Sequence, residues 1–191
     1  MRKSILSLLL GAVMAVGVSS AHAEVPYMDV LGATTAPIGY VQLCQREPSF
    51  CVPRNEAPSV VQLTEPSWRD LLAINTYVNQ AVAPMTDEDL YGVPEVWTMP
   101  ANYGDCEDYV IMKRSKLLER GWPASALLIT VVREQSGSGH AVLTVRTDRG
   151  DFVLDNQEAN VFRWDETSYH YIKRQSEFDE TIWSTINDAR S

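Results

Sequence analysis

The hydrophobic period of the chain changes at Gly121, and this change limits the possible folds more than any other feature of the sequence. Before it, apolar residues recur every three or four positions over 65–82 and 105–120, which predicts two helices. After it, the runs ALLITVVR, HAVLTVRT and DFVLD are rich in Val, Ile, Leu and Thr, which predicts strands. SYHYIKRQ is a fourth candidate strand. Helices followed by an antiparallel meander indicate an α+β fold.

The regions around the first predicted helix differ in character. That helix, 65–82, has an apolar stripe at helical spacing, and Pro66 is tolerated near its start. The stripe consists of Trp68, Leu71, Leu72, Asn75, Val78 and Val82. Residues 24–60 show no sustained period, so we expect an irregular segment wrapped on the core. Residues 85–104 predict a long acidic loop.

The second predicted helix begins at the motif GDCEDY and ends at Gly121, with Pro123 beyond it. Asp105 is the expected N-cap, and the acidic residues after it suit the first helical turn. The residues that recur at helical spacing are Cys106, Tyr109, Val110, Lys113 and Leu117. We therefore expect Cys106 to head the packed face of this helix.

Residues 1–23 predict a secretory signal peptide. A basic start is followed by an apolar run and then by Ala-His-Ala, with the cut expected after Ala23. The apolar run is shorter than the roughly 20 residues that a membrane span needs, although an uncleaved anchor is an alternative. We expect residues 24–191 to form one periplasmic or secreted domain without a membrane span.

The charge of the expected mature chain excludes one class of partner. Removal of Arg2 and Lys3 leaves 14 basic against 25 acidic residues, a formal charge of −11. Nucleic acid is therefore not an expected partner, because binding its phosphates requires basic residues. The charge is compatible with cation binding.

The three cysteines divide into a pair and a single thiol. Cys44 and Cys51 lie close together in the loop-like stretch LCQREPSFC. Export to an oxidising compartment favours a disulfide between them. Cys106 then remains unpaired, and an odd thiol in an exported protein is a candidate for chemistry.

The surroundings of Cys106 act on its thiol in opposite directions. A helix N-terminus favours the thiolate, whereas the neighbouring carboxylates of Asp105, Glu107 and Asp108 oppose it. We expect these carboxylates to face a cation or the backbone amides rather than the sulfur. Together with Asp87 they are oxygen ligands of the kind that calcium binds. The alternative is that they only stabilise the helix N-terminus.

His140 is the candidate base for Cys106, and Asp155 is the candidate partner of the second imidazole nitrogen. If the TDRGD turn centres on residues 149–150, Asp155 pairs opposite Thr144. Its distance from His140 along the strand is then about 13 Å, at roughly 3.3 Å per residue. The alternative is an inert cysteine, a structural histidine and a turn-forming acid. His170 is expected to be a half-exposed strand residue.

Four segments together resemble the bacterial transglutaminase-like cysteine proteinases. They are TDEDLYGVPEVWTMP, GDCEDYVIMKRSKLLERGWP, GHAVLTVRTDRGDFVLDNQ and YIKRQSEFDETIW, and the resemblance covers roughly residues 68–183. This family is related to periplasmic calcium-dependent proteases that release large surface adhesins. The order of GDCEDY, HAVL and LDN is more specific than the spacing of Cys, His and Asp alone.

The resemblance implies a papain-like, transglutaminase-like fold with nucleophile Cys106, base His140 and orienting residue Asp155. It also implies a calcium site with the ligands Asp87, Asp105, Glu107 and Asp108. Its implied substrate is a protein, with a surface adhesin as a candidate. In the adhesin-releasing branch a membrane receptor sequesters the protease, so an inner-membrane receptor is a candidate partner.

These observations predict an exported cysteine endopeptidase that processes a cell-surface or periplasmic protein. Two alternatives stay open at this point. A transglutaminase-type acyl transferase or amidase would pass the acyl group of the same thioester to an amine or to water. A non-catalytic, calcium-responsive binding module would use Cys106 only structurally.

Overall fold

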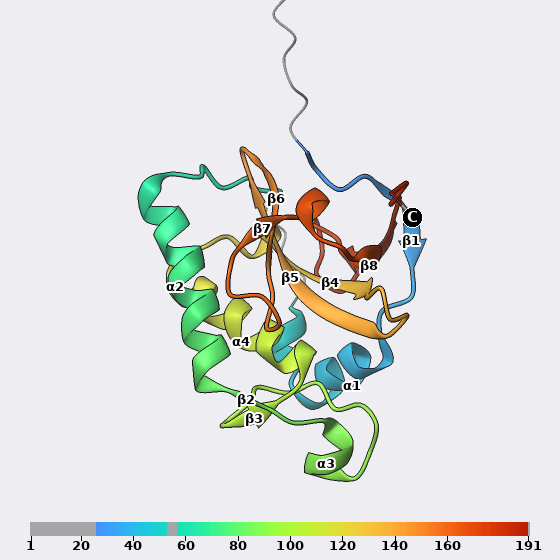
Figure 1. Cartoon of the computed structure of the whole chain (residues 1–191). Coiled ribbons are helices and arrows are strands. Elements are labelled where there is room, and N and C mark those ends of the chain that lie inside the picture. The colour runs from blue at the N-terminus through green and yellow to red at the C-terminus, as the bar shows by residue number, and fades with distance from the viewer. Residues whose placement is uncertain (1–25, 53–56, 191) are drawn as a thin grey trace, which may run out of the picture.

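The computed structural model describes residues 26–52 and 57–190, and its centre is a seven-stranded sheet in which all neighbouring strands are antiparallel (Figure 1). In spatial order the strands are β1 (Val30–Thr34), β9 (Trp183–Ile186), β8 (His170–Gln175), β4 (Leu127–Arg133), β5 (Gly139–Thr147), β6 (Gly150–Leu154) and β7 (Phe162–Arg163). The α-helices are α1 (Ile38–Arg46), α2 (Glu65–Ala81), α3 (Asp87–Tyr91) and α4 (Cys106–Glu119). The expected α+β class is confirmed.

Helices α2 and α4 lie on one side of the sheet, and α3 lies farther from it, beyond β2 and β3 (Figure 1). Helix α4 packs against β5, and α2 packs against α4. The apolar residues between them form the larger of two cores and include Leu71, Ile74, Val78, Val110, Leu117, Leu143 and Val145. The expected stripe of α2 faces this core because its buried residues repeat at the helical period.

Both predicted helices begin and end for local reasons. Thr64 caps α2 through a reciprocal pair of hydrogen bonds with Ser67, which satisfies free amides of the first turn. Asp105 is the N-cap residue of α4, although its side chain makes no capping hydrogen bond. After α4 the chain turns at Gly121, whose φ of +83° suits a residue without a Cβ.

The opposite face of the sheet carries a smaller core. Val132 of β4, Val142 of β5 and Val153 of β6 pack there with Tyr171 of β8. Met28 and Ile186 complete this cluster, and Trp164 and Tyr169 cover part of it. Both faces of the central strands are therefore buried, which explains their nearly continuous apolar sequence.

The four predicted strands are confirmed as β4, β5, β6 and β8, but the simple meander is not. Strands β4 to β7 follow one another in space, but β8 returns to the other side of β4. β9 and β1 then extend the sheet beyond β8. Sequence periodicity does not specify that β8 pairs with β4, because strand pairing depends on residues far apart in the sequence.

The irregular segment expected over residues 24–60 is wrong in part, because it contains β1 and α1. Tyr40 packs edge-on against Trp97 and Trp183, and Leu43 is also buried. These partners are distant in sequence, so the residues next to α1 in the chain do not by themselves reveal that a helix packs there. The expected disulfide joins Cys44 of α1 to Cys51 of the short helix η1 (Pro48–Cys51), with a Cα–Cα distance of 5.5 Å.

The loop expected over residues 85–104 also contains regular structure. Helix α3 lies within it, and β3 (Tyr103–Gly104) pairs in parallel with β2 (Ala83–Pro84). The expected signal peptide, residues 1–23, lies outside the described residues. Among the helices of the described part, none is long and apolar enough to cross a membrane.

Candidate active site

His140 and Asp155 form a hydrogen-bonded pair at the edge of the β5–β6 hairpin. The distance from His140 Nε2 to Asp155 Oδ1 is 2.9 Å, and each side chain is only 2% exposed. The expected displacement of about 13 Å along the strand is therefore wrong. In the hairpin Thr147 pairs with Gly150 and Leu143 with Leu154, so the turn centres on residues 148–149.

This register explains why the two side chains meet. Continued by one position, it puts Asp155 opposite Val142, on the same face as His140 because alternate residues share a face. The two side chains are thus diagonal neighbours across adjacent strands. A turn centred one residue earlier than expected moves every cross-strand partner by two positions. This shift brings Asp155 from opposite Thr144 to opposite Val142, within reach of His140.

The carboxylate of Asp155 is satisfied by several donors. Tyr169 donates its hydroxyl to Oδ2 at 2.5 Å, and the backbone amide of Gln157 donates to Oδ1 at 3.0 Å. Asn79 of α2 donates to the main-chain carbonyl of Asp155 at 2.9 Å. Burial raises the pKa of Asp155, but the hydrogen bonds from His140 and Tyr169 outweigh it and hold the pKa below its usual value. The residue is thus held as a carboxylate.

Cys106 is the first residue of α4, and its sulfur lies beside the N-terminal part of β5. The backbone amide of Ala141, the residue after His140, faces the sulfur and lowers its pKa. Sγ donates a hydrogen bond to Glu107 Oε2 at 3.1 Å. The expectation that the acids face away from the sulfur is therefore wrong for Glu107. Within 26–52 and 57–190, no hydrogen bond joins this sulfur to His140.

The environment of Cys106 favours its protonated form. Burial raises the pKa of the thiol most, and the negative charge of Glu107 raises it further. The amide of Ala141 acts in the opposite direction but is weaker. Nucleophilic attack by this sulfur therefore requires a group that accepts its proton.

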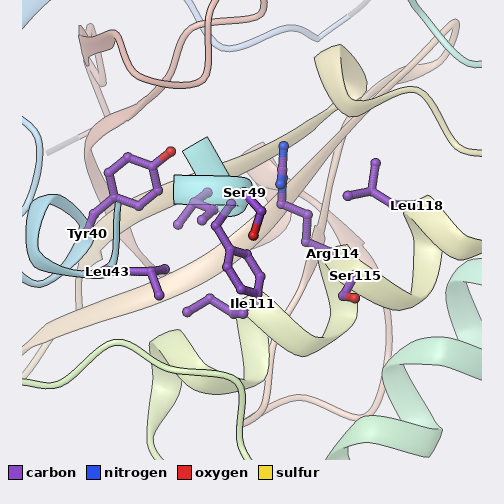
Figure 2. A pocket seen from close by; sticks show the side chains of 9 residues that line it. Tyr40, Leu43, Ser49, Ile111, Arg114, Ser115 and Leu118 are labelled. Carbon is purple, nitrogen blue, oxygen red and sulfur yellow. The ribbon is translucent and has the colours of Figure 1, made fainter. Parts of the chain in front are cut away.

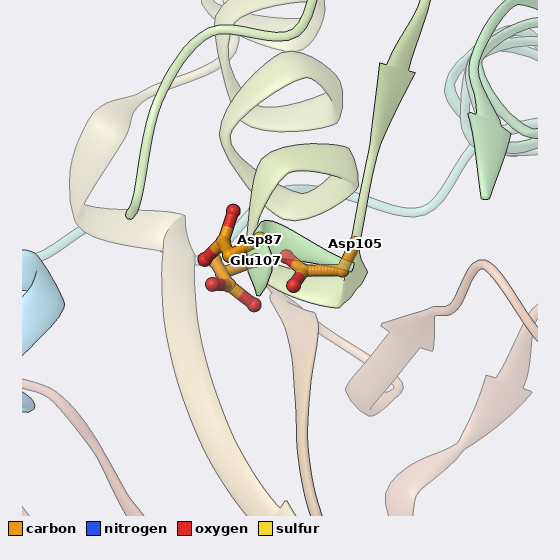
Figure 3. A group of neighbouring side chains, drawn as sticks. All are labelled: Asp87, Asp105 and Glu107. Carbon is orange, nitrogen blue, oxygen red and sulfur yellow. The ribbon is translucent and has the colours of Figure 1, made fainter. Parts of the chain in front are cut away.

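Three carboxylates gather at the N-terminus of α4 (Figure 3). Asp87 of α3, Asp105 and Glu107 each offer an oxygen, and these oxygens lie within 4.8 Å of one another. Asp87 is 1% exposed and Glu107 is 4% exposed. Burial and the charge of Asp105 raise the pKa of Glu107 to about 9, and burial likewise raises the pKa of Asp87.

The donor set of this cluster fits a hard cation. One oxygen of each residue is buried and has no hydrogen-bond partner among the described residues: Asp87 Oδ1, Asp105 Oδ1 and Glu107 Oε1. Two buried carboxylates and a partly buried one this close together are costly unless a positive charge neutralises them. Calcium binds carboxylate and carbonyl oxygens of this kind.

Asp108, the fourth expected calcium ligand, is not part of this group of three. Its Oδ1 accepts a hydrogen bond of 2.8 Å from the backbone amide of Thr98 and so holds the 85–104 connection against α4. The side chain also packs against Gly104, where an added Cβ would lie 2.6 Å from Asp108 Oδ2. Gly104 is thus required by the close approach of Asp108.

Two residues near the pair were missed as functional candidates. Tyr169 contacts both His140 and Asp155, and the only signal in the sequence was its place next to His170 in SYHYIKR. Lys113 of α4 was expected on the packed face and is 0% exposed. Its Nζ makes no hydrogen bond to any described residue, and Asp155 acts on it electrostatically. His170 is half-buried on β8, as expected.

A separate hollow of about 140 Å³ lies between α1, η1, α4 and β4 (Figure 2). Its wall includes Leu43, Phe50 and Ile111, with Arg114 at one side. Arg114 is paired with Glu180. None of the residues around Cys106 or His140 lines this hollow, so we assign it no part in the chemistry described above.

A cysteine at a helix N-terminus, packed on an antiparallel sheet that carries a buried His–Asp pair, is the arrangement of papain-like thiol enzymes. The model of the bacterial transglutaminase-like cysteine proteinases matches residues 30–191. The chain therefore belongs to this family, and its class is that of a cysteine peptidase. No curated protein matches the chain in sequence.

Solved structures of LapG from Legionella pneumophila share the fold. The calcium-bound structure is 23% identical with a TM-score of 0.55, and the match covers 65% of this chain and 74% of LapG. A second LapG structure is 25% identical with a TM-score of 0.52, covering 61% and 67% of the two chains. The EGTA-treated structure is 23% identical with a TM-score of 0.52, covering 64% and 72%. The transglutaminase-like cysteine protease fold is thus confirmed.

Proposed function

We propose that this protein is an exported cysteine endopeptidase in which Cys106 is the nucleophile, His140 the general base and Asp155 the residue that orients His140. The observation that carries the proposal is the buried hydrogen bond between His140 and Asp155, where the residue after His140, Ala141, turns its amide toward the sulfur of Cys106. A thiol nucleophile needs a base, and the base needs an orienting partner.

The hydrogen bond assigns different tasks to the two nitrogens of His140. Nε2 lies 2.9 Å from the Asp155 carboxylate, which only accepts, so Nε2 carries the proton in the neutral imidazole. Nδ1 then holds the free electron pair and takes the proton of Cys106. Catalytic hydrogen bonds are often incomplete in structures without substrate, and Sγ must leave Glu107 to reach Nδ1.

The remaining steps follow from the position of Cys106. Its thiolate attacks the carbonyl carbon of a peptide bond, and amides at the N-terminus of α4 stabilise the negative oxygen. The imidazolium of His140 protonates the leaving amine. Water, deprotonated by the same imidazole, then releases the acyl group from the sulfur.

We assign Asp87, Asp105 and Glu107 to a calcium site beside the nucleophile. Bound there, calcium supplies positive charge that offsets the carboxylates next to the thiol. Glu107 is the link between the two functions, because one of its oxygens accepts from Sγ and the other lies in the cluster without a hydrogen bond to any residue that the structure describes. The calcium-bound state of LapG supports this assignment.

The substrate, location and regulation follow from the resemblance and from the N-terminal sequence. Residues 1–23 act as a signal peptide, and residues 24–191 act in the periplasm or outside the cell. The substrate is a periplasmic or surface protein, with an adhesin as the first candidate. An inner-membrane receptor is the candidate regulatory partner.

Activity on a proteome-derived peptide library, with products identified by mass spectrometry, tests the proposal. Cys106→Ala and His140→Ala are expected to abolish cleavage while the melting temperature stays near that of the wild type. His170→Ala is the matched control, because His170 lies half-buried on β8 and its ionic contact is with Asp188 rather than with the pair, so this variant should keep full activity. Wild-type cleavage by Cys106→Ala would refute the assignment, and amine incorporation without cleavage would favour acyl transfer.

Alkylation with iodoacetamide tests the thiol and the metal together. Cys106 is the free cysteine of the described chain, so the label reports on one sulfur. Calcium is expected to speed alkylation relative to EGTA, because a positive charge beside the sulfur favours the thiolate. Equal rates in calcium and EGTA would contradict the proposed link.

A further inference from the structure

The two oxygens of Asp155 are held by different side chains. Oδ1 pairs with His140 Nε2 at 2.9 Å, and Oδ2 accepts the hydroxyl of Tyr169 at 2.5 Å. The amide of Gln157 adds a third hydrogen bond, also to Oδ1. Rotation of the carboxylate away from His140 would therefore break the hydrogen bond to Tyr169 at the same time.

The ring of Tyr169 also contacts His140. The two ring centroids are 5.4 Å apart, and the planes are inclined by 47°. Tyr169 thus touches both members of the pair, one through its hydroxyl and the other through its ring. A side chain that contacts both partners restricts the rotation of each.

Strand order brings Tyr169 to this place. Val132 of β4 pairs with His140 of β5 on one side and with Tyr171 of β8 on the other. Tyr169 lies just before β8 and packs with Tyr171 on the smaller core. Its side chain therefore reaches past the end of β4 to the pair on the neighbouring hairpin.

We infer that Tyr169 is a positioning residue that locks the Asp155 carboxylate and the His140 ring in their productive orientation. This inference rests on the proposed function of His140 and Asp155. Tyr169 acts through Asp155, and it neither attacks the substrate nor transfers a proton. Its loss should therefore lower kcat and leave KM largely unchanged, because the substrate contacts stay the same.

Tyr171 provides a matched control. It is buried on the same face, its hydroxyl pairs with Thr167 at 2.9 Å, and its ring packs edge-on against Trp164. It makes no hydrogen bond to His140 or Asp155 among the described residues. Tyr171→Phe thus removes a comparable hydroxyl without touching the pair, whereas Tyr169→Phe removes the donor to Asp155 and keeps the ring.

The first experiment compares the kinetics of the two variants of residues 24–191, with calcium, on the peptide that the wild type cleaves fastest in the library. Tyr169→Phe is expected to lower kcat by about 10-fold, the effect of losing one hydrogen bond to a charged group. Tyr171→Phe should keep wild-type kcat. Unchanged kcat in Tyr169→Phe, or an equal loss in both variants at equal melting temperature, would overturn the inference.

The second experiment needs no activity. In nitrogen-15 labelled protein, the Nε2 proton of His140 should give a downfield NMR signal, assigned by its loss in His140→Gln and its persistence in His170→Gln. Tyr169→Phe should shift or broaden this signal, and Tyr171→Phe should leave it in place; no difference between the variants counts against positioning. If Cys106→Ala retains cleavage, the proposed function fails, yet this comparison still decides whether Tyr169 positions the pair.

Discussion

At the scale of single residues, the chemistry of the site is set by what each titratable side chain contacts. Cys106 has an acceptor in Glu107 and an adjacent amide from Ala141, and burial raises its pKa. Asp155 is also buried, yet its pKa is lowered because hydrogen-bond donors surround its carboxylate. Burial alone therefore does not decide the charge of a group at this site.

Substitution of Asp155 tests how the base is oriented. Asp155→Ala removes the acceptor of His140 Nε2, and kcat is expected to fall by at least about 100-fold. Asp155→Asn should retain more activity, because an amide oxygen can accept the same hydrogen bond and Cys-His-Asn sites are functional. Steady-state kinetics on one library peptide measures both, and equal activity of Asp155→Ala and the wild type would contradict the orienting role.

Substitution of Lys113 tests the cost of a buried amine. Burial lowers the pKa of Lys113 to about 7, well below the value of an exposed lysine. The unfolded chain binds this proton more strongly, so the group destabilises the fold most below pH 7 and progressively less as the pH rises toward 10. Lys113→Met should therefore increase the free energy of unfolding by about 1–4 kcal/mol at neutral pH.

Urea unfolding at several pH values measures this gain, which is expected to shrink as the pH rises. Lys116→Met is the control on the same helix, because Lys116 is partly exposed and pairs only with Glu119. Its effect should stay within about 0.5 kcal/mol, as for other surface substitutions. A loss of stability in Lys113→Met would mean that the amine has a stabilising partner.

At the scale of the elements, α1 and the hairpin depend on contacts of different range. The β5–β6 turn is local, and a shift of its centre by one residue decides whether Asp155 meets His140. Helix α1 is placed by Trp97 and Trp183 and is tied to η1 by the disulfide. The disulfide closes a short loop, since its cysteines are seven positions apart.

Removal of the disulfide tests how far it stabilises this element. Cys44→Ser with Cys51→Ser is expected to cost about 2.5 kcal/mol, the entropy of a loop of this length in the unfolded chain. Urea unfolding measures the loss, and reduced wild-type protein should match the double variant. Equal stability of the oxidised wild type and the double variant would show that the bond adds nothing to the fold.

At the scale of the whole molecule, the carboxylate cluster joins distant segments. Asp87 belongs to α3, whereas Asp105 and Glu107 belong to the start of α4. Repulsion between these carboxylates opposes the approach of α3 to the start of α4. A bound cation would attract all three carboxylates and so favour that approach. Metal binding should therefore stabilise the 85–104 connection against unfolding and also increase the reactivity of the Cys106 thiol.

Calcium is expected to raise the melting temperature of the mature protein by about 5–10 °C at 100-fold excess over its dissociation constant. Calorimetry in calcium and in EGTA measures the shift. Asp87→Asn should lose most of it, while Asp89→Asn should keep it, because Asp89 is exposed on the same short helix and pairs with Thr86. An unchanged melting temperature in the wild type would refute the site.

Much of the fold could be predicted because its signals are local. The periods of α2 and α4, the Gly121 stop and the apolar runs of β4 to β6 each depend on neighbouring residues, and these elements are confirmed. The place of β8 beside β4 and the existence of α1 depend on partners far along the chain. Local patterns carry no information about such pairings.

The sequence by itself determined the α+β class, the family resemblance and the place of Cys106 at a helix N-terminus, because these follow from period, caps and motif order. Only the tertiary structure decided that Asp155 meets His140, that Tyr169 contacts both, and that Asp87 joins Asp105 and Glu107 without Asp108. The physical reason is strand register and packing, which place side chains within ångströms of one another across long separations in sequence.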